Sequence, residues 1–245
     1  MRLLVTRPET DAVTLKAHLI GLGHEVLIEP LIEIEFEPLI ELELELDEAQ
    51  ALIATSRNAL RGLAQSSLAG AARSLPLYAV GPGTAATARA LGFELVLQGP
   101  KDARALVGFI AQRAQVYGGP LIYLAGEVKA ADVGSELRHL GFHVQEPVVY
   151  RIKAAQKLDD AIIARFRNRE VEGVLLLSPQ TARTYARLII KHGLSAQIDN
   201  TVHFCLSPAV ALGLSGLPPL KVLSAAQPNL QSMLALVAQG VALLP

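Results

Sequence analysis

Short apolar runs alternate with stretches of helical periodicity along the whole chain. Runs such as residues 51–55 (ALIAT) and 173–177 (GVLLL) contain no charged side chain. Continuous apolar strands are typical of a parallel sheet that is covered on both faces. Their alternation with helices indicates an α/β doubly wound fold. The predicted strands are 3–6, 25–28, 51–55, 76–80, 94–97, 121–125, 143–150, 173–177, 202–206 and 221–224.

Ten strands exceed one ordinary sheet and favour two domains. Residues 32–37 (IEIEFE) alternate strictly between apolar and acidic, as in a strand that is half exposed. We expect this strand to pair with residues 148–153 (VVYRIK) as a two-stranded link between the domains. One domain would then comprise residues 1–31 and 154–245, and an inserted domain residues 38–147. Such a link permits hinge motion, which suits a cleft that closes on a ligand.

The chain also contains an ordered internal repeat of three units. Residues 3–28 match 121–146, ALIATSRNAL at 51–60 matches GVLLLSPQTA at 173–182, and YAVGPGTA at 78–85 matches FCLSPAVA at 204–211. The three units thus occur twice along the chain, in the same order. A general likeness among all parallel α/β units is the alternative explanation.

The C-terminal segment is apolar enough to suggest either a membrane anchor or a core helix. Residues 222–245 carry no charged side chain, but they contain several polar residues, and the apolar part is shorter than a membrane span. Leu230, Met233, Leu234, Val237, Val241 and Leu244 fall on one helical face. We therefore predict a helix that packs on a sheet.

Composition narrows the classes of function. The 22 Lys and Arg nearly balance the 23 Asp and Glu, so we expect no general binding to nucleic acid. Residues 29–48 hold nine acids and no base, which we interpret as a solvated face. The remainder has 22 bases against 14 acids, which leaves room for a locally positive site.

The cysteine and histidine content of the sequence argues against a disulfide and against a metal site. One cysteine, Cys205, forms no internal disulfide and is interpreted as a small core residue. The six histidines show no metal-ligand spacing, and we predict no metal site. The first apolar run is too short for a signal peptide. We therefore expect a cytoplasmic protein.

The loops that follow the strands carry the candidate chemistry, because ligands of doubly wound folds bind beyond the carboxyl ends of strands. Several of these loops place Ser, Thr or Asn at a predicted helix start. Such residues cap helices, but helix starts also bind anions. Arg7, Arg57 and Lys129 could add charge-assisted hydrogen bonds. A ligand with several carboxylates or phosphates would fit this arrangement.

Two further sequence features are open to more than one interpretation. Gly81-Pro82-Gly83 lacks both the Walker sequence and the full GxGxxG pattern, so it is weak support for a nucleotide site. Tyr150, on the predicted link, could present its hydroxyl to the cleft or could be a half-buried strand residue.

Five segments of the chain form a familiar succession: LLVTRPETDAVTLKAHLIGLGHEV, LIATSRNALRGL, YAVGPGTAATARALGF, LIYLAGEVKAADVGSELRHLGFHVQEPVVYRI and VLLLSPQTARTYARLI. In order and spacing, they together resemble the uroporphyrinogen-III synthase family over nearly the whole chain. The resemblance implies two flavodoxin-like domains joined by a two-stranded ladder. It also implies a cytosolic, cofactor-independent lyase of tetrapyrrole and haem-type biosynthesis. That family cyclises hydroxymethylbilane to uroporphyrinogen III, inverting ring D and releasing water.

The resemblance also assigns site residues. Tyr150 matches the tyrosine of the linking strand and is the first candidate for a catalytic proton donor, although a tyrosine hydroxyl is a weak acid. At the third repeated unit the chain has Ser207-Pro208-Ala209-Val210-Ala211 in place of a G-P-T-T-A-like run, so contact there would use Ser207 or backbone N–H groups. With the residues from the loops, the predicted substrate-binding set is Thr6, Arg7, Ser56, Arg57, Asn58, Gly81, Thr84, Gly126, Lys129, Ser178, Pro179, Thr181 and Ser207.

The expected partner is a linear tetrapyrrole. Hydroxymethylbilane synthase is a candidate protein partner, the chain is expected to be a monomer, and no nucleic acid or membrane is expected. The main alternative is a two-domain anion-binding regulator without catalysis. A nucleotide-dependent transferase is a second alternative, disfavoured by the missing phosphate loops.

Overall fold

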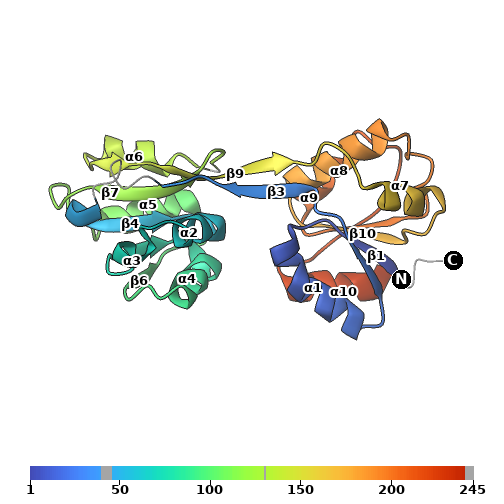
Figure 1. Cartoon of the computed structure of the whole chain (residues 1–245), viewed down its shortest axis with the longest axis horizontal. Coiled ribbons are helices and arrows are strands. Elements are labelled where there is room, and N and C mark those ends of the chain that lie inside the picture. Colours follow the sequence, from blue (N-terminus) through green and yellow to red (C-terminus); the bar gives the residue numbers. More distant parts are fainter. Residues whose placement is uncertain (40–45, 130, 241–245) are drawn as a thin grey trace. The chain divides into compact units, whose positions relative to one another are not determined.

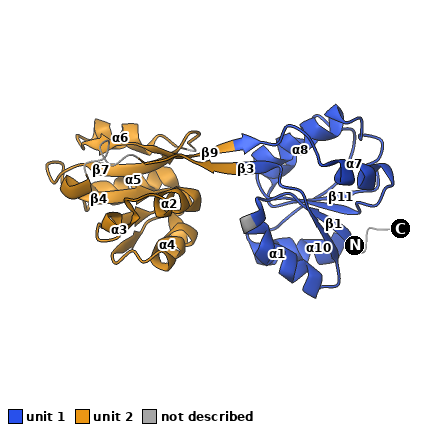
Figure 2. Cartoon of the chain, viewed as in Figure 1, with its two compact units in different colours: residues 1–33, 153–245 blue, residues 34–152 orange. Residues whose placement is uncertain are grey.

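The computed structural model describes residues 1–39, 46–129 and 131–240 (Figure 1). The chain divides into two compact units, residues 1–33 with 153–245 (unit 1) and residues 34–152 (unit 2), coloured separately in Figure 2. The predicted fold class is confirmed, because each unit is built on a largely parallel sheet. The predicted boundaries lay at the ends of the linking strands, whereas the division falls within them.

Unit 1 contains a five-stranded parallel sheet in the order β12-β11-β10-β1-β2. Its strands are β1 (Arg2–Val5), β2 (Glu25–Ile28), β10 (Gly173–Leu176), β11 (Val202–Cys205) and β12 (Lys221–Ser224). Its helices are α1 (Glu9–Gly21), α7 (Asp160–Arg167), α8 (Pro179–Lys191), α9 (Pro208–Ala211), η3 (Leu212–Leu214) and α10 (Leu230–Gly240). Helices α1 and α10 cover one face, and α7, α8 and α9 cover the other (Figure 1).

Unit 2 contains a sheet in the order β3-β9-β7-β4-β5-β6, with β8 also beside β7. Its strands are β3 (Ile32–Phe36), β4 (Ala51–Ala54), β5 (Leu77–Ala79), β6 (Val96–Gln98), β7 (Leu121–Gly126), β8 (Val144–Gln145) and β9 (Val148–Ala154). Its helices are η2 (Leu46–Glu48), α2 (Arg57–Ala64), α3 (Ala69–Ala72), α4 (Gly81–Ala90), α5 (Ala103–Ala111) and α6 (Val133–His139). Helices α2, α3 and α4 pack on one face, and α5 and α6 on the other.

The two sheets share one strand order when the repeated units are matched. The strands of the first unit are β1 and β7, those of the second are β10 and β4, and those of the third are β11 and β5. In both sheets the second unit lies between the first and the third. The repeat seen in the sequence is therefore a repeat of structure.

Strands β3 and β9 are hydrogen-bonded neighbours, and each passes from one unit into the other. The N–H of Glu37 donates to the carbonyl of Val149 (3.1 Å), and the N–H of Ala155 donates to that of Leu31 (3.0 Å). One bond joins the end of β3 to the start of β9, and the other joins the start of β3 to the end of β9. The two strands are therefore antiparallel. The two strands form the ladder that the alternating pattern predicted.

Two segments differ from the expectation or lie partly outside the described residues. The predicted strand 143–150 is divided into β8 and β9, since Pro147 has no N–H to donate to a neighbouring strand. Helix α10 buries Met233 and Val237 as predicted, whereas Val241 and Leu244 lie outside the described residues. Among the described residues, no helix is both long enough and apolar enough to cross a bilayer.

The acidic segment is not simply a solvated face. Glu37 forms an ion pair with Arg151 (2.6 Å), and Glu29 accepts a hydrogen bond from the N–H of Asp159 (2.9 Å). Glu41, Glu43 and Glu45 lie outside the described residues. Part of the acidic charge is therefore compensated within the chain.

Candidate functional site

The predicted site residues gather at the carboxyl ends of adjacent strands in each sheet. In unit 2, neighbouring strands β7, β4 and β5 lead into the loops that carry Lys129, Ser56 and Gly81. In unit 1, neighbouring strands β1, β10 and β11 lead into the loops that carry Thr6, Ser178 and Ser207. Parallel strands end at the same edge, so the topology brings each set of loops together.

In unit 2, the start of α2 is capped by the chain itself. Ser56 is its N-cap residue, and the Ser56 hydroxyl accepts a hydrogen bond from the Asn58 N–H (3.1 Å). The side-chain oxygen of Asn58 accepts a hydrogen bond from Arg61 (3.1 Å). Arg57 is exposed at the first turn. Of the three predicted residues, Arg57 alone is charged and exposed, so it is the most accessible to a substrate carboxylate.

The start of α4 has no side-chain cap. Its N-cap residue is Val80, and Pro82 contributes no N–H. Gly81 adopts a φ of +61°, which favours glycine, and its N–H donates to the carbonyl of Pro100 (2.8 Å). Thr84 lies in the first turn and is 6% exposed. A helix start without a capping side chain is a suitable receptor for an anion.

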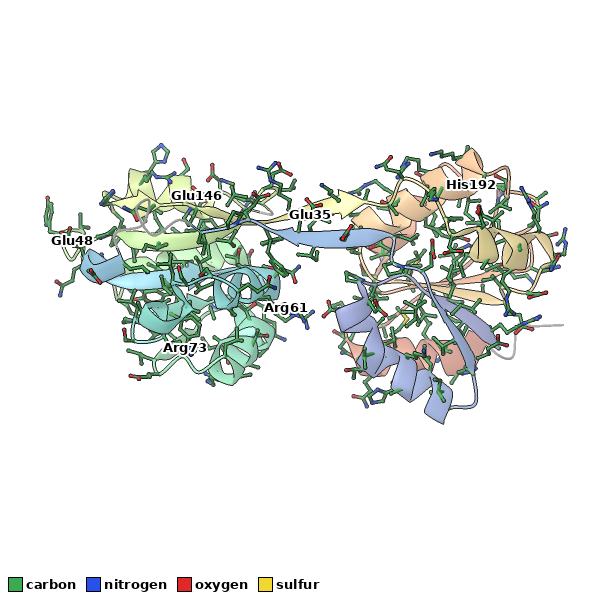
Figure 3. All side chains as sticks on the ribbon, in the orientation of Figure 1. Glu35, Glu48, Arg61, Arg73, Glu146 and His192 are labelled. Atoms are coloured by element: carbon green, nitrogen blue, oxygen red, sulfur yellow. The ribbon has the colours of Figure 1, made fainter. Side chains whose placement is uncertain are left out.

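Lys129, after β7, already binds carboxylates of the chain. Its Nζ lies 2.6 Å from Glu146 Oε1 and 3.8 Å from Asp132 Oδ1. The hydrogen bond with Glu146 raises the pKa of Lys129. Glu146, which is labelled in Figure 3, also pairs with Arg138 (3.0 Å). A substrate carboxylate would have to compete with Glu146 for Lys129.

Tyr150 lies on β9, in register with the last residue of β7, Gly126. Only 8% of Tyr150 is exposed, and it packs in the core that contains Leu60, Leu124 and Val149. Tyr150 is therefore more deeply buried than a half-exposed strand tyrosine. Its place beside the end of β7 brings it to the same edge as the loops of unit 2.

Sequence reasoning missed a second tyrosine near this edge. The Tyr123 hydroxyl lies 3.0 Å from the Thr55 hydroxyl, and burial raises the pKa of Tyr123. Thr55 directly precedes Ser56. A hydroxyl-bearing residue inside the otherwise aliphatic strand LIYLA was the available signal.

In unit 1, three of the predicted hydroxyls are engaged within the chain, because the Ser178 and Thr181 hydroxyls lie 2.8 Å apart and that of Thr6 bonds a backbone carbonyl. Thr6 is fully buried, and its hydroxyl donates to the carbonyl of Leu175 (2.7 Å). Ser178 caps α8 by accepting from the Thr181 N–H (3.1 Å), and Thr181 is 4% exposed. These contacts argue against Thr6 as a direct side-chain contact. They give Ser178 the capping role that was the alternative interpretation, and Thr181 is its partner inside α8.

Arg7 and Ser207 are partly exposed residues of the unit 1 edge. Arg7 pairs with Asp11 one turn along α1 (3.1 Å). Ser207 precedes α9, is partly exposed, and forms no side-chain cap bond. Pro179 occupies the first position of α8. The Ser207 hydroxyl is thus the least committed of the hydroxyls predicted in this unit.

The one cysteine of the chain is a core residue. Cys205 is fully buried, as predicted, and burial raises the pKa of its thiol to about 12. Within residues 1–39, 46–129 and 131–240, no group of three His, Cys, Asp or Glu side chains is placed to hold a metal ion.

The chain was compared with protein families and with solved structures. The family model described as HEM4, uroporphyrinogen-III synthase HemD, matches residues 13–235. The fold is similar to a crystal structure of uroporphyrinogen-III synthetase from Helicobacter pylori 26695, at 19% identity and a TM-score of 0.67, covering 98% of this chain and 99% of that one. It is also similar to a mutant uroporphyrinogen III synthase from the extremely thermophilic bacterium Thermus thermophilus, at 16% identity and a TM-score of 0.58, covering 99% of each chain.

No curated protein sequence matches the chain significantly. At identities below 20%, the similarity to the two solved structures concerns the fold. The family model, in contrast, extends over most of the sequence, from α1 to α10. The chain belongs to the uroporphyrinogen-III synthase family.

Proposed function

We propose that this chain binds hydroxymethylbilane through the loops at the carboxyl edges of both sheets and converts it to uroporphyrinogen III with inversion of ring D. The match of the family model to residues 13–235 carries the reaction class, a cyclising lyase of tetrapyrrole biosynthesis. The loop contacts support the assignment of individual residues.

The substrate carries eight carboxylates, one acetate and one propionate on each pyrrole. Carboxylates are bound by helix starts and by charge-assisted hydrogen bonds. The uncapped start of α4, exposed Arg57 and the uncommitted Ser207 hydroxyl are suited to these groups. We assign them the principal receptor roles, with Arg7 able to join after release from Asp11.

The reaction begins with loss of the substrate hydroxyl as water, which leaves an azafulvene cation. The leaving oxygen needs a proton, and we assign its donation or orientation to the Tyr150 hydroxyl. Attack through the substituted carbon of ring D then gives a spiro intermediate, and rearrangement and ring closure complete the inverted macrocycle. The balance is one hydroxymethylbilane to one uroporphyrinogen III and one water.

The protein's main contribution is to hold a flexible substrate in one folded conformation. Because the chemistry is largely the substrate's own, a fixed conformation lowers the entropic barrier to closure. It must also prevent the uncatalysed closure, which proceeds without inversion. Receptors on several separate loops suit this task better than one strong site.

The cellular setting follows from the substrate's chemistry. Hydroxymethylbilane closes spontaneously, so the enzyme that supplies it must work in the same compartment. We assign this chain to the cytoplasm as a monomer that receives its substrate from hydroxymethylbilane synthase. Sedimentation velocity of the purified chain, alone and with that enzyme, checks the monomeric state and the association with that enzyme.

The test of the function is a coupled assay with enzymatically generated hydroxymethylbilane, in which product isomers I and III are resolved. The proposal predicts isomer III as the main product. Isomer I at the spontaneous rate would instead support the anion-binding regulator. A requirement for added nucleotide would support the transferase.

A further inference from the structure

Gly126 and Tyr150 lie opposite each other where β7 ends. The two residues are in register across the β7–β9 pair, and the pairing shows an irregularity between Ala125 and Gly126. The N–H of Glu127 donates to the carbonyl of Tyr150 (3.0 Å). This bond fixes the backbone of Tyr150 beside the last residues of β7.

The hydroxyl-bearing end of the Tyr150 ring lies directly over Gly126. A Cβ atom added to Gly126 would lie 2.5 Å from Cζ, 2.7 Å from the hydroxyl oxygen and 2.9 Å from Cε1 of Tyr150. Carbon–carbon contacts have their energy optimum at ≈ 3.5–4.0 Å, so no β-carbon fits beside the ring as it stands. Any larger residue at position 126 must displace the phenol end.

Space, and not backbone conformation, accounts for glycine at this position. Gly126 is not among the glycines with positive φ, which include Gly23, Gly81 and Gly119. An alanine could therefore adopt the backbone of Gly126 without strain. The cost of the substitution would fall on the ring of Tyr150.

The ring cannot move without carrying its hydroxyl with it. Tyr150 is 8% exposed, and its neighbours in the core include Leu60, Leu124 and Val149. A tyrosine side chain has only two rotatable angles before the planar ring, so relief of the contact swings the hydroxyl to a new place. A displacement of about 1 Å is enough to impair a catalytic group.

We propose that Gly126 is a positioning residue, which provides the space that sets the Tyr150 hydroxyl at the carboxyl edge of β7. This inference rests on the proposed role of Tyr150. It replaces the prediction of Gly126 as a substrate contact with a role that acts through the tyrosine. Catalysis by Tyr150 would then depend on the absence of a side chain at position 126.

The test compares the single variants Gly126→Ala and Tyr150→Phe with the double variant and the unaltered chain, measuring kcat, KM and the isomer ratio. We expect each single variant to lower kcat about ten-fold or more, with little change in KM. The double variant should be no slower than Tyr150→Phe. Once the hydroxyl is absent, displacement of the ring moves no catalytic group. Gly108→Ala is the matched control, since a Cβ on Gly108 meets no atom within 4 Å.

The outcomes separate this inference from the function on which it rests. Unchanged kcat in Tyr150→Phe would overturn the role of the hydroxyl, and with it the positioning role. A slow Tyr150→Phe beside a fully active Gly126→Ala would overturn the positioning role alone. Independent, multiplicative losses in the double variant would also overturn it, because Gly126 would then act by another route.

A second pair of variants covers the case in which Gly126→Ala does not fold. Removal of the ring in Gly126→Ala/Tyr150→Ala should restore folding to the level of Tyr150→Ala, as followed by thermal unfolding. A double variant that stays unfolded while Tyr150→Ala folds would contradict the inference, because Gly126 would then be needed for something other than the ring.

Discussion

At the scale of single residues, the site is distinguished by which hydroxyls are already engaged within the chain. The hydroxyls of Ser56 and Ser178 accept backbone N–H groups, and that of Thr6 donates to a buried carbonyl. Ser207 has no such cap bond. A sequence shows the hydroxyls but not their partners, because capping and anion binding use the same residue types at the same helix positions.

A variant of Thr84 tests whether its hydroxyl contributes to substrate binding at the α4 start. Thr84→Ala should raise the KM for hydroxymethylbilane about ten-fold and leave kcat nearly unchanged, since one hydrogen bond to a charged group contributes roughly 1.5 kcal/mol. Steady-state kinetics with isomer analysis measure both constants. Thr87→Ala is the control, because the Thr87 hydroxyl donates to the carbonyl of Gly83 within the same helix (3.1 Å). Equal KM values for both variants and the unaltered chain would show that Thr84 is a core residue and does not contribute to substrate binding.

At the scale of elements, most of the architecture was predictable. The apolar runs predicted ten strands, and their number favoured two domains. The structure adds that matched units of the repeat take matched places in the two sheets. The break at Pro147 was not predicted, although a proline inside a predicted strand is a signal for such a break. Glu146 and Tyr123 were missed because their partners Lys129 and Thr55 come from distant segments.

The first turn of α2 carries a prediction about charge. Arg57→Gln should raise the KM for hydroxymethylbilane several-fold, and the difference should shrink at high salt, because Arg57 is exposed and its field is screened. Arg89→Gln is the matched control, since it removes the same charge from the last turn of α4. If KM rises equally in both variants, the effect of Arg57→Gln comes from the change in net charge and not from a contact with the substrate.

The packing of α8 against β11 carries a prediction about pH. The Tyr185 hydroxyl lies 3.0 Å from Nε2 of the fully buried His203, and burial lowers the pKa of His203 from its ordinary 6.5 to about 4. Between these values the unfolded chain binds a proton that the folded chain does not. The free energy of unfolding should therefore fall as pH drops from about 6.5 to about 4, by about 3 kcal/mol in all.

Urea unfolding at several pH values measures this dependence. In His203→Gln, which keeps a hydrogen-bonding side chain without the titration, the fall in stability over the same range should be smaller by about that amount. Identical pH profiles for the two proteins would show that His203 does not contribute.

At the scale of the whole molecule, the duplicated architecture gives the chain two similar sheet edges with different chemistry. The edge of unit 2 carries Tyr150 and the uncapped α4 start, whereas that of unit 1 carries Arg7 and Ser207. We expect binding energy from both edges and proton donation from unit 2 alone. Substitutions in unit 1 should accordingly change KM and the isomer ratio more than the rate of water loss.

The central claim is that this protein folds hydroxymethylbilane and closes it with ring D inverted. A single-turnover experiment tests it most directly, with protein in excess over freshly generated substrate and the two product isomers quantified after oxidation. We predict closure far faster than the spontaneous reaction, with isomer III as nearly the whole product. Isomer I, formed no faster than without protein, would contradict it.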